Sequence, residues 1–445
     1  MSLLDATKIA VQSNPEIGQA IENRQATEFE LKQALGLYAP RLDFEASTGA
    51  ERLDNPSARA AGIQNDPLYP SQVGLVATYD VFDGGYRQSE ANRQAARVDG
   101  ASFRVLERSE FIALQIAREY FEIILQQRII DLSLQNVAFH QKTLQDVTAT
   151  IGNGQLTEAD KQQAQERLNA ARARVAEAKE VLESSKIDFY KDVGIPITAP
   201  SLPPRIGKAL PNSLADAIAM GRRTNPQVLI AGADLDAASA VVAQSASGFG
   251  PKVSLEARAN TGLDVGGVAG QTTDLSGRVI MKWSLFDGGI KAAQVQESAH
   301  RESEAMLAQQ QAGREVEQAV RVSWDRMHQQ GDLAAIYKQQ LNVSDALIKS
   351  YQQQFGVGQR SLLDVLEAQN TRFSVQIQYE TAQFAARFAE YRLMAASGAL
   401  LPYMHLKAPN QADAYARQLL KSPSAADARP QKLTPLDLRM TPAVN

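Results

Sequence analysis

The sequence predicts a mainly α-helical chain that consists of one segment present twice and that also supplies two pairs of long β-strands. Three observations support this fold class. Short motifs recur in the same order in residues 1–200 and 212–400, two stretches in each copy alternate apolar and polar residues, and long stretches without proline favour helix. Each copy is therefore expected to contain a helix, a strand, a loop, a second strand and two long helices.

The duplication rests on three shared motifs, which are an Asn-Pro pair, a Phe-Asp-Gly-Gly tetrad and a Gly-x-Gly pair. In the first and second copies they occupy residues 14–15 and 225–226, 82–85 and 286–289, and 152–154 and 356–358. The spacing between the copies falls from 211 to 204 residues between Pro251 and Phe286, which indicates one deletion of seven residues. A surface loop can absorb such a change.

Composition excludes several classes of function. The 445 residues carry a net charge of -4, which argues against nucleic acid as the main partner. There is no cysteine, and the four histidines lack the spacing of metal ligands, so no disulfide, metal site or cofactor is expected. No apolar run reaches the roughly 18 residues of a membrane-spanning helix. The N-terminus lacks the basic and apolar regions of a signal peptide, so we expect either a cytoplasmic protein or a mature form.

The helices are predicted from proline positions and from long uninterrupted stretches. The first helix is expected from about Asn14 to Tyr38, since Pro15 suits a first helical turn and Pro40 ends the helix. The long helices are expected at residues 85–151 and 157–190 in the first copy, and at 289–355 and 361–397 in the second. A helix of roughly 65 residues measures about 100 Å, far more than a globular domain needs. Residues 194–211 are expected to form a linker, and the tail after Leu401 an irregular segment.

Four strands are predicted from strict alternation of apolar and polar residues. In the first copy the apolar positions run from Leu42 to Ala50 in the first strand and from Val73 to Val81 in the second. In the second copy they run from Val253 to Ala259 and from Leu275 to Leu285. Each strand therefore has one apolar and one polar face.

The apolar faces, which include Phe44, Tyr79 and Trp283, must be covered by something apolar. In one interpretation the strands form a small soluble sheet that packs on a helix. In the other they face lipid, and their length of about ten residues suits a transmembrane strand. Four strands cannot close a barrel, and an open edge is not tolerated in lipid. A trimer that pools twelve strands is the simplest closed solution, and the long helices would then form a ring around a channel.

The sequence resembles the TolC family of outer-membrane efflux and secretion ducts over about residues 3–400. The most specific part is the segment from Phe355 to Gln369, which is similar to the family's aromatic-x-x-Gly-x-Arg-x-x-x-Asp-Val-Leu-acid-Ala segment at a helix reversal near the periplasmic tip. Asn14-Pro15, Pro40-x-Leu42 and the two Phe-Asp-Gly-Gly corners also match. Each match alone would be weak, but together they occur in the right order and are duplicated.

The resemblance implies a homotrimer with a twelve-stranded β-barrel in the outer membrane and a long α-helical barrel in the periplasm, with a mixed belt around its middle. The corresponding parts of this chain are residues 41–84 and 252–288 for the strand pairs, 14–40, 85–190, 225–251 and 289–397 for the helical barrel, and 1–13, 191–224 and 398–445 for the equatorial belt and tail. The missing signal peptide then indicates a mature form.

The function that the resemblance implies is an export channel of a Gram-negative cell, in contact with outer-membrane lipid. The channel would dock on an inner-membrane transporter, of ABC or RND type, and on a periplasmic adaptor protein. The cargo would be proteins in type I secretion, small toxic compounds, or both. The absence of cysteine argues against the lipid-anchored branch of the family, and the Phe-Asp-Gly-Gly corners look more like the branch that serves type I secretion.

Asp364 and Glu367 are the candidate residues of a pore constriction. They lie three positions apart at the start of a helix and therefore share one face. In the family the matching acids ring the closed tunnel mouth, and three copies would place six carboxylates around one axis. Such a ring concentrates cations and should raise the pKa of some of its members. The simpler interpretation is that acids in a first helical turn suit the helix dipole.

Arg360 matches the family's arginine that holds the mouth shut, and the resemblance makes Asp160 its expected partner. The alternative is a solvated surface arginine of little energetic consequence. Phe355 departs from the family pattern, because some members have a tyrosine there whose hydroxyl helps to hold the mouth closed. Gly154 and Gly358 are expected to form the turns at the two tips, and their contact with an adaptor is implied by the resemblance only.

Two rival classes of function remain to be weighed. An enzyme has little support, because the sequence shows no catalytic constellation, phosphate loop or metal spacing. A soluble coiled-coil scaffold or adaptor protein is the serious alternative, since long antiparallel helix pairs suit it equally well. The strands favour the channel, because an adaptor would have no use for two duplicated strands with lipid-like outer faces inside its coil.

Overall fold

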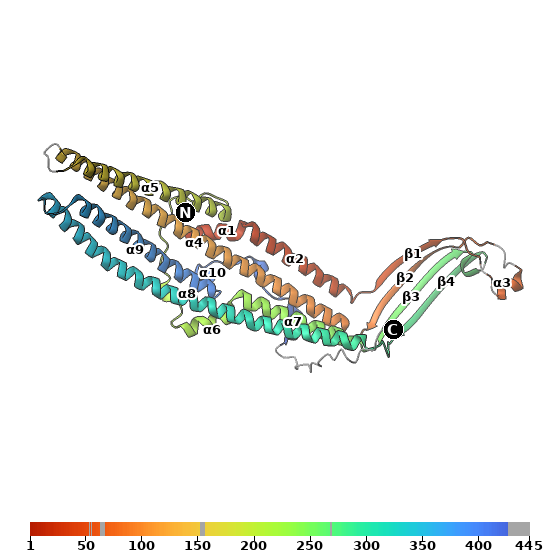
Figure 1. Ribbon diagram of the computed structural model, residues 1–445. Helices are drawn as coiled ribbons and strands as arrows, with labels where there is room; N and C mark the ends of the chain where they lie inside the picture. The colour runs from red at the N-terminus through yellow and green to blue at the C-terminus, as the bar shows by residue number, and fades with distance from the viewer. Residues whose placement is uncertain (53, 55, 63–66, 152–155, 268, 426–445) are drawn as a thin grey trace, which may run out of the picture. The chain divides into compact units, whose positions relative to one another are not determined.

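The protein is described from a computed structural model, in which residues 1–445 are placed except 53, 55, 63–66, 152–155, 268 and 426–445 (Figure 1). The chain divides into two compact units. The first consists of Met1–Asn23, Ser102–Ile230 and Gln310–Asp413, and the second of Arg24–Ala101, Ala231–Gln309 and the described part of Ala414–Asn445.

Helices make up most of the described chain. The longer ones are α1 (Leu3–Ser13), α2 (Pro15–Gly36), α4 (Tyr86–Ile151), α5 (Glu158–Val193), α6 (Leu214–Thr224), α7 (Pro226–Ser247), α8 (Ile290–Gly356) and α9 (Leu362–Ala396). The short ones are α3 (Pro56–Ala61), α10 (Leu400–Tyr403) and α11 (Ala416–Leu420), with 3-10 turns η1 (Gly207–Ala209), η2 (Val265–Gly267) and η3 (Asn410–Ala412). The four long helices that the sequence predicts are therefore present within a few residues of their expected ends.

The N-terminal segment differs from the sequence prediction, because α1 precedes the helix that was expected to begin near Asn14. Ser2 caps α1, and its side chain and that of Asp5 each accept a hydrogen bond from the other residue's backbone N–H. Asn14 lies between α1 and α2 with an extended backbone (φ -67°, ψ 127°). Pro15 explains this break, because the proline ring disfavours helical geometry at the residue before it.

The two Asn-Pro pairs connect the start of one helix with the end of another. In the first copy these are α2 and α5, and in the second copy α7 and α9. The side chain of Asn14 accepts a hydrogen bond from the N–H of Glu16 (2.9 Å) and donates one to the carbonyl of Asp192 (2.8 Å). The corresponding bonds in the second copy are from the N–H of Gln227 to Asn225 (2.9 Å) and from Asn225 to the carbonyl of Ala396 (2.9 Å). One buried side chain thus caps one helix and satisfies a carbonyl of another, which explains why the pair is present twice.

The four predicted strands form one antiparallel sheet in the second unit, in the order β1-β2-β3-β4 (Figure 1). They are β1 (Arg41–Thr48), β2 (Ser71–Phe82), β3 (Lys252–Leu263) and β4 (Gln271–Lys282). The register aligns Phe44, Leu75, Ala259 and Leu275 in one row across the sheet. The neighbouring row holds Asp43, Val76, Arg258 and Ser276. The predicted separation into an apolar and a polar face is therefore confirmed, with Val76 and Ile280 as apolar residues on the polar face.

The Phe-Asp-Gly-Gly corners lead from the sheet into the long helices. Asp83 accepts hydrogen bonds from the N–H of Gly85 (3.1 Å) and of Arg87 (3.0 Å), and so caps the start of α4. Asp287 makes the same two bonds, to Gly289 (3.1 Å) and Lys291 (3.2 Å), at the start of α8. Gly84 and Gly85 have φ angles of 69° and 93°, which favour glycine. The motif is thus a strand-to-helix corner that both copies need.

The first unit has a continuous apolar core in which α4, α5 and α9 contact α1 and α10. Phe121 packs edge-on against Tyr391, with ring centroids 5.3 Å apart. The hydroxyl of buried Tyr120 donates to the carbonyl of Met1 (2.9 Å), and the N–H of Ser201 donates to the same hydroxyl (3.0 Å). These contacts hold both the N-terminus and the linker between the copies on the long helices.

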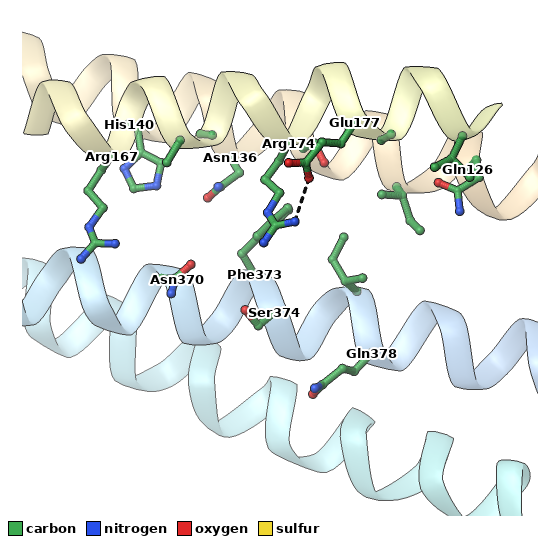
Figure 2. A pocket seen from close by; sticks show the side chains of 17 residues that line it. Gln126, Asn136, His140, Arg167, Arg174, Glu177, Asn370, Phe373, Ser374 and Gln378 are labelled. Atoms are coloured by element: carbon green, nitrogen blue, oxygen red, sulfur yellow. Dashed lines mark hydrogen bonds and ion pairs between the residues drawn. The ribbon is translucent and has the colours of Figure 1, made fainter. Parts of the chain in front are cut away.

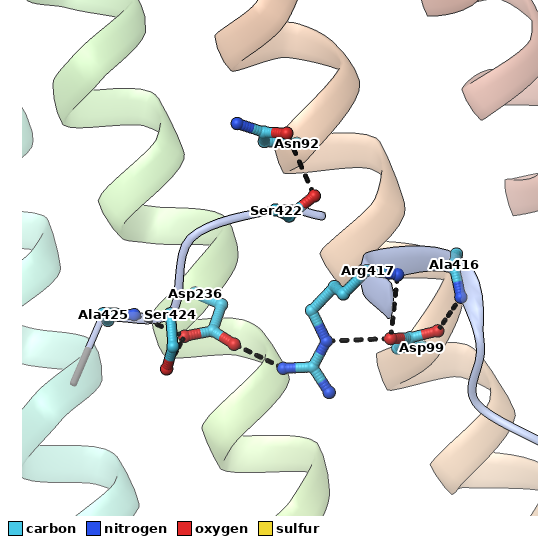
Figure 3. Close-up of polar contacts among 8 residues, drawn as sticks. All are labelled: Asn92, Asp99, Asp236, Ala416, Arg417, Ser422, Ser424 and Ala425. Carbon is cyan, nitrogen blue, oxygen red and sulfur yellow. Dashed lines mark hydrogen bonds and ion pairs between the residues drawn. The ribbon is translucent and has the colours of Figure 1, made fainter. Parts of the chain in front are cut away.

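The C-terminal segment is more ordered than the sequence predicts. In the second unit α11 packs on Leu31, Ala95 and Val98. Figure 3 shows Arg417 between two carboxylates, Asp99 of α4 (Nε to Oδ2, 2.8 Å) and Asp236 of α7. The prediction of an irregular tail was wrong for α11, and long-range ion pairs together with the packing of α11 hold this part of the chain in place.

Among the described residues, α7 is long and apolar enough to cross a membrane by length and composition, with a mean hydropathy of 1.3. The sequence prediction that no such stretch exists overlooked α7, whose apolar residues are interrupted by Asp234 and Asp236. The ion pair between Asp236 and Arg417 argues for protein rather than lipid around this helix.

Candidate functional site

The apolar face of the sheet is uncovered in the single chain. Leu275 is 83% exposed and Val279 is 72% exposed, although both are large aliphatic residues. Other exposed apolar side chains of this face include Leu42, Phe44, Val73, Leu75, Tyr79, Phe82, Leu255, Leu263 and Met281. A contiguous apolar surface of this kind marks a site of contact with lipid or with another protein.

Both outer edges of the sheet are open. Among the strands of the described part of the chain, β1 pairs only with β2, and β4 pairs only with β3. Each edge therefore presents a row of backbone N–H and C=O groups without a partner in this sheet. Such edges are tolerated in water but not in a hydrocarbon environment. If the apolar face meets lipid, the two edges must pair with strands of other chains.

The polar face of the sheet carries balanced charge. Glu256 lies 3.3 Å from Arg278, and Lys252 lies 2.9 Å from Asp80. The register places five basic and five acidic residues on this face, namely Arg41, Lys252, Arg258, Arg278, Lys282, Asp43, Glu45, Asp80, Glu256 and Asp274. A lumen lined by this face would be hydrated without a strong preference for one sign of charge.

The turn from α8 to α9 forms one tip of the first unit. Gly358 has a φ angle of 72°, and its N–H donates to the carbonyl of Phe355 (3.0 Å). The N–H of Gln359 donates to the carbonyl of Gln354 (2.9 Å). This pair of bonds ends a helix with glycine in the left-handed conformation. Gly154, the expected turn residue of the other tip, lies outside the described residues.

Asp364 has a local structural role that the sequence prediction did not include. Its carboxylate accepts hydrogen bonds from the N–H (3.2 Å) and the hydroxyl (2.8 Å) of Ser361, and the Ser361 hydroxyl caps α9 in return. Asp160 makes the same arrangement with Thr157 at the start of α5. The hydrogen bond from the Ser361 side chain lowers the pKa of Asp364. In the single chain, therefore, the pKa shift of Asp364 is opposite to the rise expected for a ring of carboxylates.

Glu367 lies on the exposed side of α9, three residues after the half-buried Asp364. The residues between them, Val365 and Leu366, are buried in the tip. The two acids therefore share a face that points away from the packing of the chain, as their spacing predicts.

Arg360 does not pair with Asp160 within the chain. Its Nε donates to the side chain of Gln354 (3.1 Å), its guanidinium lies 4.4 Å from the centre of the Tyr351 ring, and its Nη1 lies 3.9 Å from Asp364. Within one chain the structure therefore does not bring Arg360 and Asp160 together, and a pairing across a chain boundary stays a prediction. The physical reason is local, because Tyr351 and Gln354 of α8 are within reach of Arg360 while the Asp160 carboxylate is engaged by Thr157.

Phe355 packs against two apolar clusters at the tip. One cluster contains Val147, Ala164, Leu362 and Leu366, and the other contains Ile348, Val365 and Ala368. The phenyl ring therefore links the end of α8 with α9 by burial. This partial burial of the ring explains why an aromatic residue without a hydroxyl is suited to this position.

Buried carboxyl groups in the first unit were not anticipated from the sequence. Glu110 accepts hydrogen bonds from the N–H groups of Leu400 and Leu401 (both 3.2 Å), and burial raises its pKa to about 7. Burial and then the charge of Asp192 raise the pKa of Glu119 to about 8. Gln115 donates to Asp192 (2.5 Å). The sequence feature that could have predicted their burial is that Glu110 and Glu119 occupy positions among the apolar residues of a helix.

Comparison with known proteins gives a family match over most of the chain. The family described as "Outer membrane efflux protein" matches residues 7–194 and 218–399. The outer membrane efflux protein BepC of Brucella suis is 23% identical over 73% of this chain and 72% of its own length. The alkaline protease secretion protein AprF of Pseudomonas aeruginosa is 23% identical over 90% and 85%. The Campylobacter jejuni CmeC outer membrane channel has a similar fold, with a TM-score of 0.79, 14% identity and coverage of 95% and 90%.

Proposed function

Because this chain belongs to the outer membrane efflux protein family, we propose that it forms a trimeric channel that exports substrates across the outer membrane of a Gram-negative cell. Proteins similar to it are outer-membrane channels and not enzymes, and the predicted membership of the TolC family is confirmed. The chain is accordingly an outer-membrane protein. The alternative of a soluble scaffold loses its support with this family assignment.

The observation that carries the proposed assembly is the open sheet with one exposed apolar face. Each chain supplies four strands, and a closed barrel in a membrane needs at least about eight. If β4 of one chain pairs with β1 of the next, the backbone N–H and C=O groups of both edges gain hydrogen-bond partners. The apolar face can then point to lipid. Three copies give a twelve-stranded barrel, and the sequence motifs of the two corners would join it to a helical barrel.

The first prediction tests this edge pairing with cysteines, which the natural chain lacks. Three double variants combine Leu275→Cys on β4 with one cysteine on β1, which is Leu42→Cys, Phe44→Cys or Ala46→Cys. The β1 position is varied so that one of the three matches the register between chains, and that variant should form disulfides between chains. Within one chain two strands separate these positions, roughly 14 Å apart, which is too far for a disulfide. Non-reducing gels of the protein in mild detergent should therefore show covalent trimers.

The controls for this prediction are the single-cysteine variants, which can form at most dimers. Mass measurement of the cysteine-free protein in the same detergent should give a trimer. A stable monomer of full length in the absence of detergent would contradict the shared barrel.

We also propose that the channel works with an inner-membrane transporter, of ABC or RND type, and a periplasmic adaptor that contacts the helical tips, including Gly154 and Gly358. The name of one relative indicates protease secretion and that of another indicates efflux. Either cargo class suits a lumen with balanced charge. The form of the two Phe-Asp-Gly-Gly corners favours type I protein secretion.

For the tip, we propose that Glu367 and Asp364 of three chains surround the periplasmic mouth of the channel. Glu367 carries most of this proposal, because it is exposed and lies outside the capping box that engages Asp364. Arg360 and Phe355 would hold the closed mouth by packing at the end of α8 and by contacts with neighbouring chains. Asp160 remains a candidate partner of Arg360 across a chain boundary.

The second prediction concerns conductance in planar bilayers. The double variant Asp364→Asn and Glu367→Gln removes up to six charges from one constriction, so block by divalent cations should weaken by about tenfold or more, equivalent to ~1.4 kcal/mol. Glu367→Gln alone should give a large part of this effect while the capping box stays intact. Arg360→Ser should instead increase conductance and leave the cation block unchanged. Wild-type block in the double variant would show that the acids serve only the start of α9.

A further inference from the structure

A cavity of about 630 Å³ lies in the first unit between α4, α5 and α9. Figure 2 shows His140, Arg167 and Asn370 close to one end and Gln126 and Gln378 at the other. Its apolar lining consists of Ile129, Ala170, Ala171, Ala178, Val181, Phe373 and Ile377. The volume falls within the range of about 300–1,000 Å³ that is typical of small-molecule sites.

Two polar atoms at one end of this cavity lack a hydrogen-bond partner among the described residues. His140 is only 3% exposed, and its Nδ1 is buried without a partner. The Nε of Arg167 is also buried without one, because Glu166 lies 3.5 Å away outside hydrogen-bond geometry. A buried polar group without a partner costs about 1–3 kcal/mol, so both groups are poised to bind a ligand atom.

The chemistry of this end favours an acceptor with negative charge. Arg167 always carries a proton, and its Nε–H, which lies 3.5 Å from the Glu166 carboxylate without a hydrogen bond, can only donate. Burial and then the charge of Arg167 lower the pKa of His140, which is therefore a neutral imidazole that can donate from one nitrogen. Asn370 of α9 adds an amide beside them (Figure 2). The lining contains one acid, Glu177, and it is bonded to Arg174 (2.8 Å) nearer the middle.

We propose that this cavity binds a small organic carboxylate with an apolar body. This ligand site is additional to the proposed export function. The carboxylate accepts hydrogen bonds from Arg167, His140 and Asn370. The apolar body lies against Phe373 and Ile377. This arrangement gives both unpartnered nitrogens a hydrogen-bond partner, with His140 in the tautomer that donates from Nδ1, and buries an apolar group in the same step, as small-molecule sites commonly do.

Benzoate is the probe for this site, and the full chain in lipid nanodiscs is the sample. Calorimetric titration near neutral pH should show more benzoate binding to this sample than to empty nanodiscs. Benzamide should bind at least about tenfold more weakly, because it lacks the negative charge. Arg167→Met, which keeps the apolar stem and removes the donors, should reduce benzoate affinity by about tenfold or more. Arg172→Met, an exposed position on the same helix outside the cavity lining, is the matched control and should leave the affinity unchanged.

A second measurement keeps the proposal testable if Arg167→Met fails to fold. Crystals of the unaltered protein soaked with 4-iodobenzoate should show anomalous density for iodine beside Phe373 and Ile377. Equal binding of benzoate and benzamide, an affinity that Arg167→Met does not change, or iodine density elsewhere only would each overturn the proposal. None of these outcomes depends on whether the protein transports cargo.

Discussion

Val279→Arg should reduce the stability of the membrane-embedded protein by about 2–4 kcal/mol and sharply lower the amount of assembled channel. Val279 lies on the apolar face of β4, in a row with Leu255 and Tyr79 and without an acid to pair with arginine. If this face meets the hydrocarbon region, the guanidinium must be buried in lipid or drawn to the interface at a cost. Urea unfolding of protein in lipid vesicles, together with the trimer yield in outer membranes, measures the effect.

The neighbouring residue provides a matched control for this substitution. Ile280→Arg introduces the same side chain on the same strand, but the register places it on the polar face, in a row with Ser254 and Asp80. An arginine there can remain hydrated and can pair with Asp80, so the yield and stability of the channel should change little. If the two variants were equally tolerated, or equally harmful, the assignment of the two faces to lipid and lumen would be wrong.

The stability of the first unit should depend on pH through its buried carboxyl groups. Glu110 and Glu119 have pKa values raised from 4.5 to about 7 and about 8 in the folded chain. The folded state therefore holds these protons more tightly than the unfolded state does, so the free energy of unfolding should be highest at acidic pH. It should decline as the pH rises from about 5 through 8 and then level off. For Glu110 alone the shift corresponds to as much as about 3 kcal/mol.

Glu119→Gln provides the direct test of this pH dependence. Glutamine cannot ionise, and its amide can donate to Asp192 as the protonated acid does, so the variant should lose less stability between about pH 5 and pH 8 than the natural chain. Glu122→Gln, on the same helix and hydrogen-bonded to Gln126, is the control and should follow the natural curve. Thermal unfolding followed by circular dichroism gives both curves. If the stability of the natural chain and of Glu119→Gln changed with pH in the same way, the pair of Glu119 and Asp192 would not contribute to the pH dependence.

Sequence alone determined the elements and their faces, because periodicity reports directly on the surroundings of each residue. The alternation from Val253 to Ala259 predicted a strand and the residues that share each of its faces, and the register confirmed both. The duplicated motifs predicted corners and tips, since glycine and proline act on the backbone at their own positions. The capping role of Asp364 was within reach of the sequence too, because Ser361 and Asp364 have the spacing of a capping box.

Only the tertiary structure decided which residues meet across long distances in the chain. Asn14 bonds to residue 192, Asp99 and Asp236 share Arg417, and Glu119 lies beside Asp192. Arg360 contacts Tyr351 and Gln354 rather than Asp160 for the same reason. A polar residue in a sequence shows only that it needs a partner. Which partner it finds depends on how helices that are far apart in the chain pack together, and this packing also created the cavity beside His140.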